Sequence, residues 1–281
     1  MNNLNIYGFA DEASPFIDEQ IIAMKRNSLK GLEIRNVDNI NVSDITPEKA
    51  KEVKKKIDDA GLIVWSVGSP IGKIDLIGDD FNVHLEKFKR TLEIADVLDC
   101  RNIRLFSFFI PEGINPDEYK DDVLEKMAKF VDINSNTKIT LCHENEKGIY
   151  GDIARRCLEI HKNIPEIKAV FDPANFVQCG EDTKKAWEAL KPYVHYMHIK
   201  DSLSDGSIVP CGKGEGNVEY IINDYRKMGG VDFTMEPHLA VFSGLEALEQ
   251  DGNVSKIGNR FVYENNNDAF DAGCTAFKSL C

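Results

Sequence analysis

Short apolar runs alternate with longer, charge-rich segments along the whole chain. Eight of these runs have the length and composition of buried strands, at positions 4–9, 31–35, 62–67, 102–107, 138–144, 167–172, 194–199 and 231–236. Runs this short, rich in Val, Ile, Leu and Phe, are typical of strands in the interior of an α/β fold.

The segments between the runs have the spacing of amphipathic helices, at positions 16–28, 47–60, 84–98, 117–131, 153–162, 183–191 and 218–228. Pro47 and Pro116 stand at predicted helix starts, and Gly61 and Gly229 follow predicted helix ends. After the eighth strand, we expect an irregular excursion at 246–259 and a last helix at 266–280. The pattern predicts one domain, residues 1–281, folded as a single (β/α)8 TIM barrel, with a doubly wound open sheet as the alternative.

Composition narrows the function classes. Hydrophobic residues make up 42% of the chain, and the 47 acidic against 34 basic side chains give a net charge of −13. This acidic balance argues against a nucleic-acid partner, and no apolar run approaches the roughly 20 residues of a membrane span. The first residues, Met1 to Asn5, show no secretion signal, so we expect a cytoplasmic protein. The seven cysteines form no C-x-x-C pair, and we expect them to be reduced.

Polar residues close the last four predicted strands: Glu144, Asp172, His198 and Glu236. In a barrel, the carboxyl ends of the strands form the rim that carries the active site. Alternate side chains of a strand point to opposite faces, so the apolar neighbours of these residues would face the helices. The same parity turns all four polar side chains toward the barrel axis.

Three carboxylates in one enclosed space repel each other unless a cation compensates them. Three carboxylate oxygens and one imidazole nitrogen suit a single divalent ion, such as Mn²⁺, Mg²⁺, Co²⁺ or Zn²⁺. An ion that bridges a carbonyl and its neighbouring hydroxyl acidifies the C–H between them by stabilising an enediolate. Glu144 and Glu236, on strands separated by two others, are the predicted catalytic acid and base. Epimerisation, isomerisation and dehydration all remain open.

Several sequence runs resemble the xylose isomerase-like TIM barrels known as sugar phosphate isomerase/epimerase proteins. These runs are Cys142-His143-Glu144-Asn145, Phe171-Asp172-Pro173-Ala174-Asn175, His198-Ile199-Lys200-Asp201 and Met235-Glu236-Pro237-His238. The resemblance implies metal ligands at Glu144, Asp172, His198 and Glu236. It also implies a metal-dependent isomerase or epimerase of carbohydrate metabolism, acting on a small sugar or sugar derivative.

Two positions depart from the ketose 3-epimerases of this family. Asn175 and Ser204 stand where those enzymes have a substrate-binding His and an Arg, which argues against a plain free-ketose epimerase. The His-x-Lys-Asp form, His198 to Asp201, is more similar to the inosose dehydratases. A metal-dependent dehydratase is therefore the alternative function. The additional His ligands of the endonuclease IV repair enzymes find no match in the first four strands.

Other residues are expected around the metal. Lys73, Lys200, His238 and Asn175 are the predicted substrate contacts. Glu33 and Arg35, two apart on the second strand, are predicted to form an internal ion pair. His143 has the outward parity of a packed structural residue, and the Gly-rich run 211–216 is predicted to be a mobile lid or a substrate loop. An oligomer of identical chains is left open.

Overall fold

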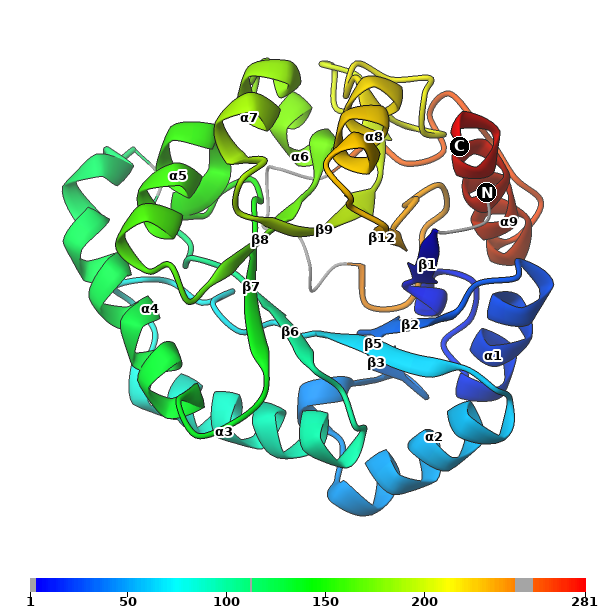
Figure 1. Cartoon of the computed structure of the whole chain (residues 1–281), viewed down its shortest axis with the longest axis horizontal. Helices are drawn as coiled ribbons and strands as arrows, with labels where there is room; N and C mark the ends of the chain where they lie inside the picture. Colours follow the sequence, from blue (N-terminus) through cyan, green and yellow to red (C-terminus); the bar gives the residue numbers. More distant parts are fainter. Residues whose placement is uncertain (1–3, 112, 246–254) are drawn as a thin grey trace.

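Eight parallel strands close into a barrel at the centre of the molecule (Figure 1). The computed structural model describes residues 4–111, 113–245 and 255–281. In order around the barrel, the strands are β1 (Asn5–Gly8), β12 (Asp232–Met235), β9 (Val194–Ile199), β8 (Lys168–Phe171), β7 (Thr140–Glu144), β6 (Asn102–Leu105), β5 (Ile63–Gly68) and β2 (Gly31–Ile34). The first strand pairs with both β2 and β12, which excludes an open sheet. The predicted TIM barrel is confirmed.

Helices surround the barrel, as the view in Figure 1 shows. They are α1 (Ile17–Arg26), α2 (Pro47–Asp59), α3 (Phe81–Val97), α4 (Lys120–Asn134), α5 (Ala154–Asn163), α6 (Pro173–Gln178), α7 (Thr183–Leu190), α8 (Val218–Lys227) and α9 (Asn266–Leu280). Capping explains two corrections to the predicted starts. Helix α3 begins three residues earlier than expected because the Asp80 side chain caps it. This side chain accepts hydrogen bonds from the backbone amides of Asn82 and Val83. Pro116 begins a separate 3-10 turn, Pro116–Tyr119, ahead of α4.

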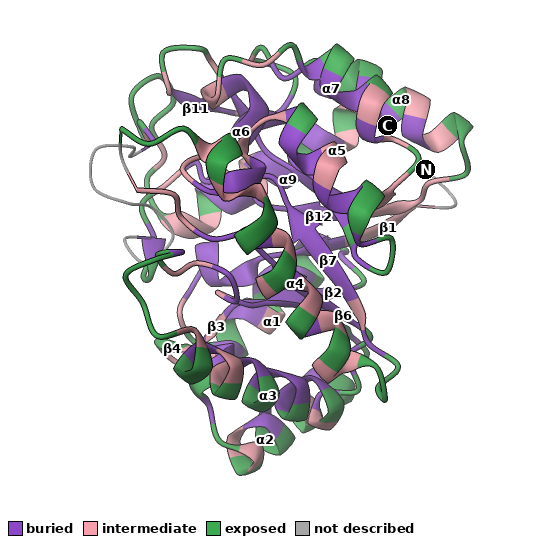
Figure 2. Ribbon diagram, turned by 90° about the vertical axis from the view of Figure 1, so that its left-hand side faces the viewer, coloured by how far each residue is buried: buried purple, intermediate pink, exposed green. Residues whose placement is uncertain are grey.

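The two faces of the strands carry two different cores. Outward side chains such as Leu141, Phe171 and Met197 join the large core between the strands and the helices. Inward side chains, Cys142 and Tyr196 among them, fill the barrel itself. Each large apolar side chain buried in this way contributes roughly 1.5–3 kcal/mol. Figure 2 shows the buried strands at the centre and the exposed outer faces of the helices. Packing therefore fixes the strand parity that aims the rim residues inward.

Besides short 3-10 turns, three small elements that follow strand ends were not predicted. They are the short helix α6 and two hairpins, β3–β4 (Asn36–Val37 with Ile40–Asn41) and β10–β11 (Asp201–Ser202 with Ile208–Val209). Helix α9 confirms the predicted last helix. Of the predicted excursion at 246–259, residues 246–254 lie outside the described part of the chain, as do Met1, Asn2 and Asn3 of the N-terminal segment. None of the described helices combines the length and apolar character that crossing a membrane requires.

Candidate metal centre and active site

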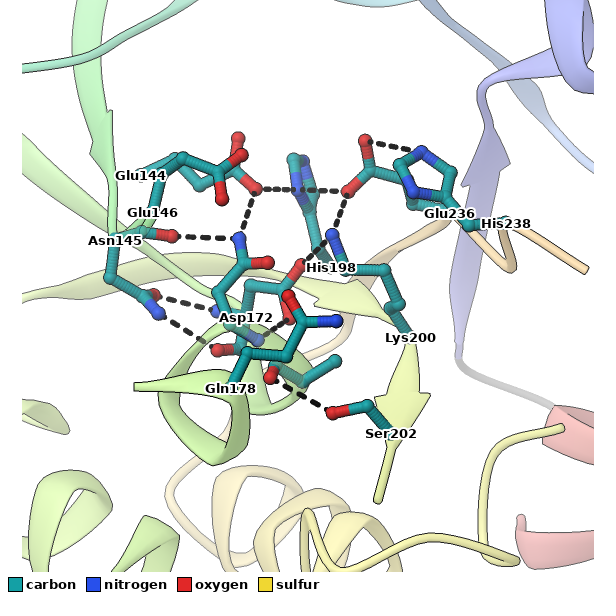
Figure 3. A network of polar contacts seen from close by, with 12 residues as sticks. Glu144, Asn145, Glu146, Asp172, Gln178, His198, Lys200, Ser202, Glu236 and His238 are labelled. Atoms are coloured by element: carbon teal, nitrogen blue, oxygen red, sulfur yellow. Dashed lines mark hydrogen bonds and ion pairs between the residues drawn. The ribbon is translucent and has the colours of Figure 1, made fainter. Parts of the chain in front are cut away.

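Four buried side chains meet at the carboxyl end of the barrel: Glu144, Asp172, His198 and Glu236. Glu144 ends β7, Asp172 follows β8, His198 lies near the end of β9, and Glu236 follows β12. One ligand atom from each lies within 4.8 Å of every other. Figure 3 shows these side chains pointing toward one another from their separate strands. The fold thus brings together the four residues predicted as metal ligands.

The spacing of these atoms suits a divalent ion. The His198 Nδ1 atom lies 2.9 Å from Glu144 Oε1 and 3.2 Å from Glu236 Oε2. Adjacent ligand atoms of an octahedral ion with bonds of about 2.1 Å lie roughly 3 Å apart. Asp172 Oδ2 is buried and accepts no hydrogen bond from the described residues, and the cation beside it is the Lys200 ammonium at 2.9 Å. The donor set, three carboxylates and one imidazole, and its spacing therefore fit the predicted ion.

Basic side chains hold the carboxylates of the cluster. Arg104 Nη1 lies 2.7 Å from Glu144 Oε2, and Lys200 Nζ lies 2.9 Å from Asp172 Oδ2. Burial favours the neutral form of Glu144, but His198 and Arg104 outweigh it and lower the pKa of Glu144 to about 2. Burial raises the pKa of Asp172 to about 7, although Lys200 opposes that shift. The neighbouring cations therefore favour the ionised form of Glu144, whereas burial favours the neutral form of Asp172.

The predicted ion pair between Glu33 and Arg35 is wrong. Arg35 binds Asp11 with two hydrogen bonds of 2.8 and 3.0 Å and Glu236 with one of 3.1 Å. Glu33 instead accepts hydrogen bonds from His198 and Tyr196. Residues two apart on a strand are separated by roughly 6.6 Å along it, so each finds partners in its own layer of the barrel.

The predicted substrate contacts line one small pocket beside the cluster, whose free volume of about 10 Å³ is roughly that of one water molecule. Its lining comprises Lys73, Arg104, Glu146, Lys147, Asn175, Lys200, Glu236, His238 and Ser255. His238 Nε2 lies 3.5 Å from Glu236 Oε1, and Asn175 Nδ2 lies 3.5 Å from Glu144 Oε1. Lys73 Nζ pairs with Glu146 at 3.3 Å and lies 4.4 Å from the centre of the Phe106 ring. The structure thus places Lys73, Lys200, His238 and Asn175 in the lining of the same pocket.

The predicted ligands and substrate contacts do not include four residues of this lining: Arg104, Glu146, Lys147 and Ser255. Lys147 donates to the side chains of Gln178 and Ser255 at 3.2 and 2.8 Å. Ser255 lies far beyond the end of β12 in the sequence, so no local pattern could reveal its place in the pocket lining. His143, in contrast, points away from the cluster and contacts the Ser107 hydroxyl at 3.0 Å, as expected of a packed structural residue.

The Gly-rich run 211–216, predicted to be a mobile lid or a substrate loop, folds around the buried carboxylate of Asp201. Asp201 accepts hydrogen bonds of 2.9 Å from the amides of Gly212, Gly214 and Gly216, and one of 3.0 Å from Ser202. A Cβ atom on Gly214 would lie 2.3 Å from Asp201 Oδ1. The glycines therefore allow backbone amides to approach one side chain closely, next to the strand end that carries His198 and Lys200.

Replacing Asp201 with Asn is expected to destabilise the fold by about 2–3 kcal/mol, because an amide nitrogen would face backbone N–H donors that now bind a carboxylate. Urea denaturation of the two proteins measures the change. Asp59→Asn is the control, since its exposed pair with Lys55 contributes less than about 1 kcal/mol. Equal stability of Asp201→Asn and the wild type would show that the loop does not depend on this carboxylate.

Comparison with known families agrees with this architecture. The family model for xylose isomerase-like TIM barrels matches residues 23–252. The chain belongs to the xylose isomerase-like TIM barrel family. No curated protein matches it.

Solved structures similar to this xylose isomerase-like barrel share its fold at low sequence identity. The IolI protein, solved with a zinc atom, superposes with a TM-score of 0.75 at 12% identity, covering 99% of this chain and 98% of its own. The probable 3-DHS dehydratase AsbF of Bacillus anthracis has a TM-score of 0.73 at 14% identity, with coverages of 98% and 99%. The 3-keto-D-glucoside 4-epimerase of E. coli has a TM-score of 0.69 at 15% identity, with coverages of 99% and 98%.

Proposed function

We propose that this protein is a divalent-metal-dependent isomerase or epimerase of a sugar or sugar derivative. The observation that carries the proposal is the convergence of Glu144, Asp172, His198 and Glu236 on one point beside a polar pocket. Family membership and the sugar epimerases among the similar structures support it. The polar side chains that line the pocket offer hydrogen-bond partners for the oxygens of a small molecule, and the net charge of −13 disfavours nucleic acid.

A bound ion would polarise a substrate carbonyl and the hydroxyl on the neighbouring carbon. This would make the C–H of that neighbouring carbon more acidic. Glu144 ends β7 and Glu236 follows β12, and the strands β8 and β9 lie between these two in the barrel. One carboxylate would take the proton from the substrate carbon, and the other would return it. Lys200, His238, Asn175 and Lys73 would bind substrate oxygens and fix the reacting carbon between the two carboxylates. Return of the proton to the opposite face of the same carbon gives epimerisation, and return to the next carbon gives isomerisation.

Dehydration is the second candidate, and Lys200 favours it. Its Nζ atom lies 2.9 Å from Asp172 Oδ2 and 3.5 Å from Glu236 Oε2. Burial opposes the charge of Lys200, but these carboxylates outweigh it and raise the pKa of Lys200 well above its usual value. The charged amine would donate a hydrogen bond to a departing hydroxyl, and the carboxylate that carries the abstracted proton would protonate this hydroxyl, which leaves as water. One of the similar structures is that of a probable dehydratase.

Deuterium uptake tests the proposed chemistry and does not require the product to be identified first. The purified protein, loaded with Mn²⁺, is incubated in D₂O with ketoses, their phosphates and inososes. We expect label at a carbon next to the carbonyl of one of these compounds. A reversible sugar mixture would identify an isomerase or epimerase, and a water-loss product that absorbs in the ultraviolet would identify a dehydratase. A protein that binds no divalent ion and exchanges no carbon-bound proton would refute the proposal.

A further inference from the structure

The two ring nitrogens of His198 face different surroundings. Nδ1 faces the carboxylate cluster, 2.9 Å from Glu144 Oε1 and 3.2 Å from Glu236 Oε2. Nε2 points to the opposite side, 3.1 Å from Glu33 Oε2. The ring is fully buried, and the Phe9 ring packs against it edge-on with 5.2 Å between centroids. Each nitrogen of His198 therefore has a fixed environment within the protein.

Glu33 is itself held in place by two other strands. Its Oε1 atom accepts hydrogen bonds from the Tyr196 hydroxyl at 2.7 Å and from the Ser66 hydroxyl at 3.2 Å. These hydroxyls come from β9 and β5, whereas Glu33 lies on β2. The Glu33 side chain is fully buried, so water does not compete for it. With Oε1 occupied in this way, Oε2 is directed at His198.

We infer that Glu33 is a positioning residue that fixes the tautomer and the ring orientation of His198 for metal binding. A neutral imidazole carries one N–H and one lone pair, and a carboxylate only accepts hydrogen bonds. Without an ion, Nδ1 also faces a carboxylate, that of Glu144, so the selection concerns the metal-bound ring. There, Glu33 keeps the hydrogen on Nε2, and the lone pair of the neutral ring is on Nδ1, directed at the cluster. Carboxylates often orient metal-binding histidines in this manner. The inference rests on the proposed metal site, and it adds a residue that belongs to neither the ligand set nor the pocket lining.

Glu33→Gln is the direct test. Glutamine has nearly the same shape, but its amide can donate to Nε2 as well as accept, so it no longer selects one tautomer. We expect the affinity for Mn²⁺, measured by calorimetry on metal-free protein, to fall about 10–100-fold. Tyr196→Phe, which removes one hydrogen bond to Glu33, is expected to cause a smaller loss. Thr234→Val is the matched control inside the barrel, because the Thr234 hydroxyl has no hydrogen-bond partner among the described residues.

A spectroscopic measurement separates positioning from a general structural effect. In the Zn²⁺-loaded wild type, nitrogen NMR should find the His198 hydrogen on Nε2. Hydrogen on Nδ1 instead would overturn the inference, even if the Glu33→Gln variant failed to fold. Wild-type Mn²⁺ affinity in a folded Glu33→Gln protein would overturn it too, while leaving the proposed function intact. If the wild-type protein bound no divalent ion, both the inference and the proposed function would fall.

Discussion

Glu144→Gln and Glu236→Gln are each expected to lower the turnover number by at least about 100-fold, because a positioned acid or base typically contributes 10²–10⁴-fold. Glutamine keeps the shape and one oxygen but neither takes nor returns a proton at neutral pH. Both carboxylates are buried in the cluster, so water cannot readily replace them. The measurement is the steady-state rate with the substrate identified by deuterium uptake, at saturating Mn²⁺.

Two controls isolate the acid and base roles. The metal content of each variant is measured, since both residues are also proposed ligands. Glu146→Gln is the matched variant: Glu146 lines the same pocket and pairs with Lys73 at 3.3 Å, but it is not part of the cluster. It should affect mainly KM. A near-wild-type turnover number in either Glu144→Gln or Glu236→Gln would remove that residue from the proposed acid and base chemistry.

Removal of divalent ions by a chelator is expected to lower the thermal denaturation midpoint by about 8–16 °C relative to protein saturated with Mn²⁺. A ligand at 1,000 times its dissociation constant stabilises the folded state by about 4 kcal/mol. For a chain of this size, 1 kcal/mol corresponds to roughly 2–4 °C. The ion would compensate carboxylates gathered in a buried space, whereas the unfolded chain leaves them apart. Differential scanning calorimetry at fixed pH measures the shift.

Asp172→Asn is the informative variant for this experiment. The Asp172 side chain also caps α6 by accepting the Asn175 amide at 3.1 Å, and asparagine caps helices equally well. The variant should therefore retain the cap but lose most of the Mn²⁺-induced shift. Asp201→Asn should show the reverse, a lower midpoint with the full shift. An unchanged midpoint in the wild type on addition of Mn²⁺ would contradict the proposed metal site.

The strand pattern made the barrel and the inward-facing rim predictable. Apolar residues such as Leu141 and Phe171 pack outward against helices, so the period of two in each strand assigns Glu144 and His198 to the other face. A carboxylate or imidazole at the carboxyl end of successive parallel strands must then lie on one rim. These inferences required only local patterns and the geometry of a closed sheet.

The partners of individual charged residues were not predictable in the same way. Glu33 and Arg35 are close in sequence, yet their hydrogen bonds go to Tyr196, His198, Asp11 and Glu236. The interior of the barrel brings together strands that are far apart in sequence. Which acceptor a guanidinium reaches depends on the position of each residue along the barrel axis and on the orientation of its side chain. The sequence specifies neither of these.

The sequence by itself determined the order and type of the main elements and the facing of their side chains, because both follow from local periodicity. The tertiary structure decided which of those side chains contact one another. It set which carboxylates lie together in the cluster, which basic side chain pairs with each carboxylate, and which nitrogen of His198 faces the cluster. It also showed that the Gly-rich run folds around Asp201, a contact that no local pattern encodes. The pairing of buried charges depends on distances of a few ångströms between segments that are remote in the sequence. Only the folded, closed barrel fixes those distances.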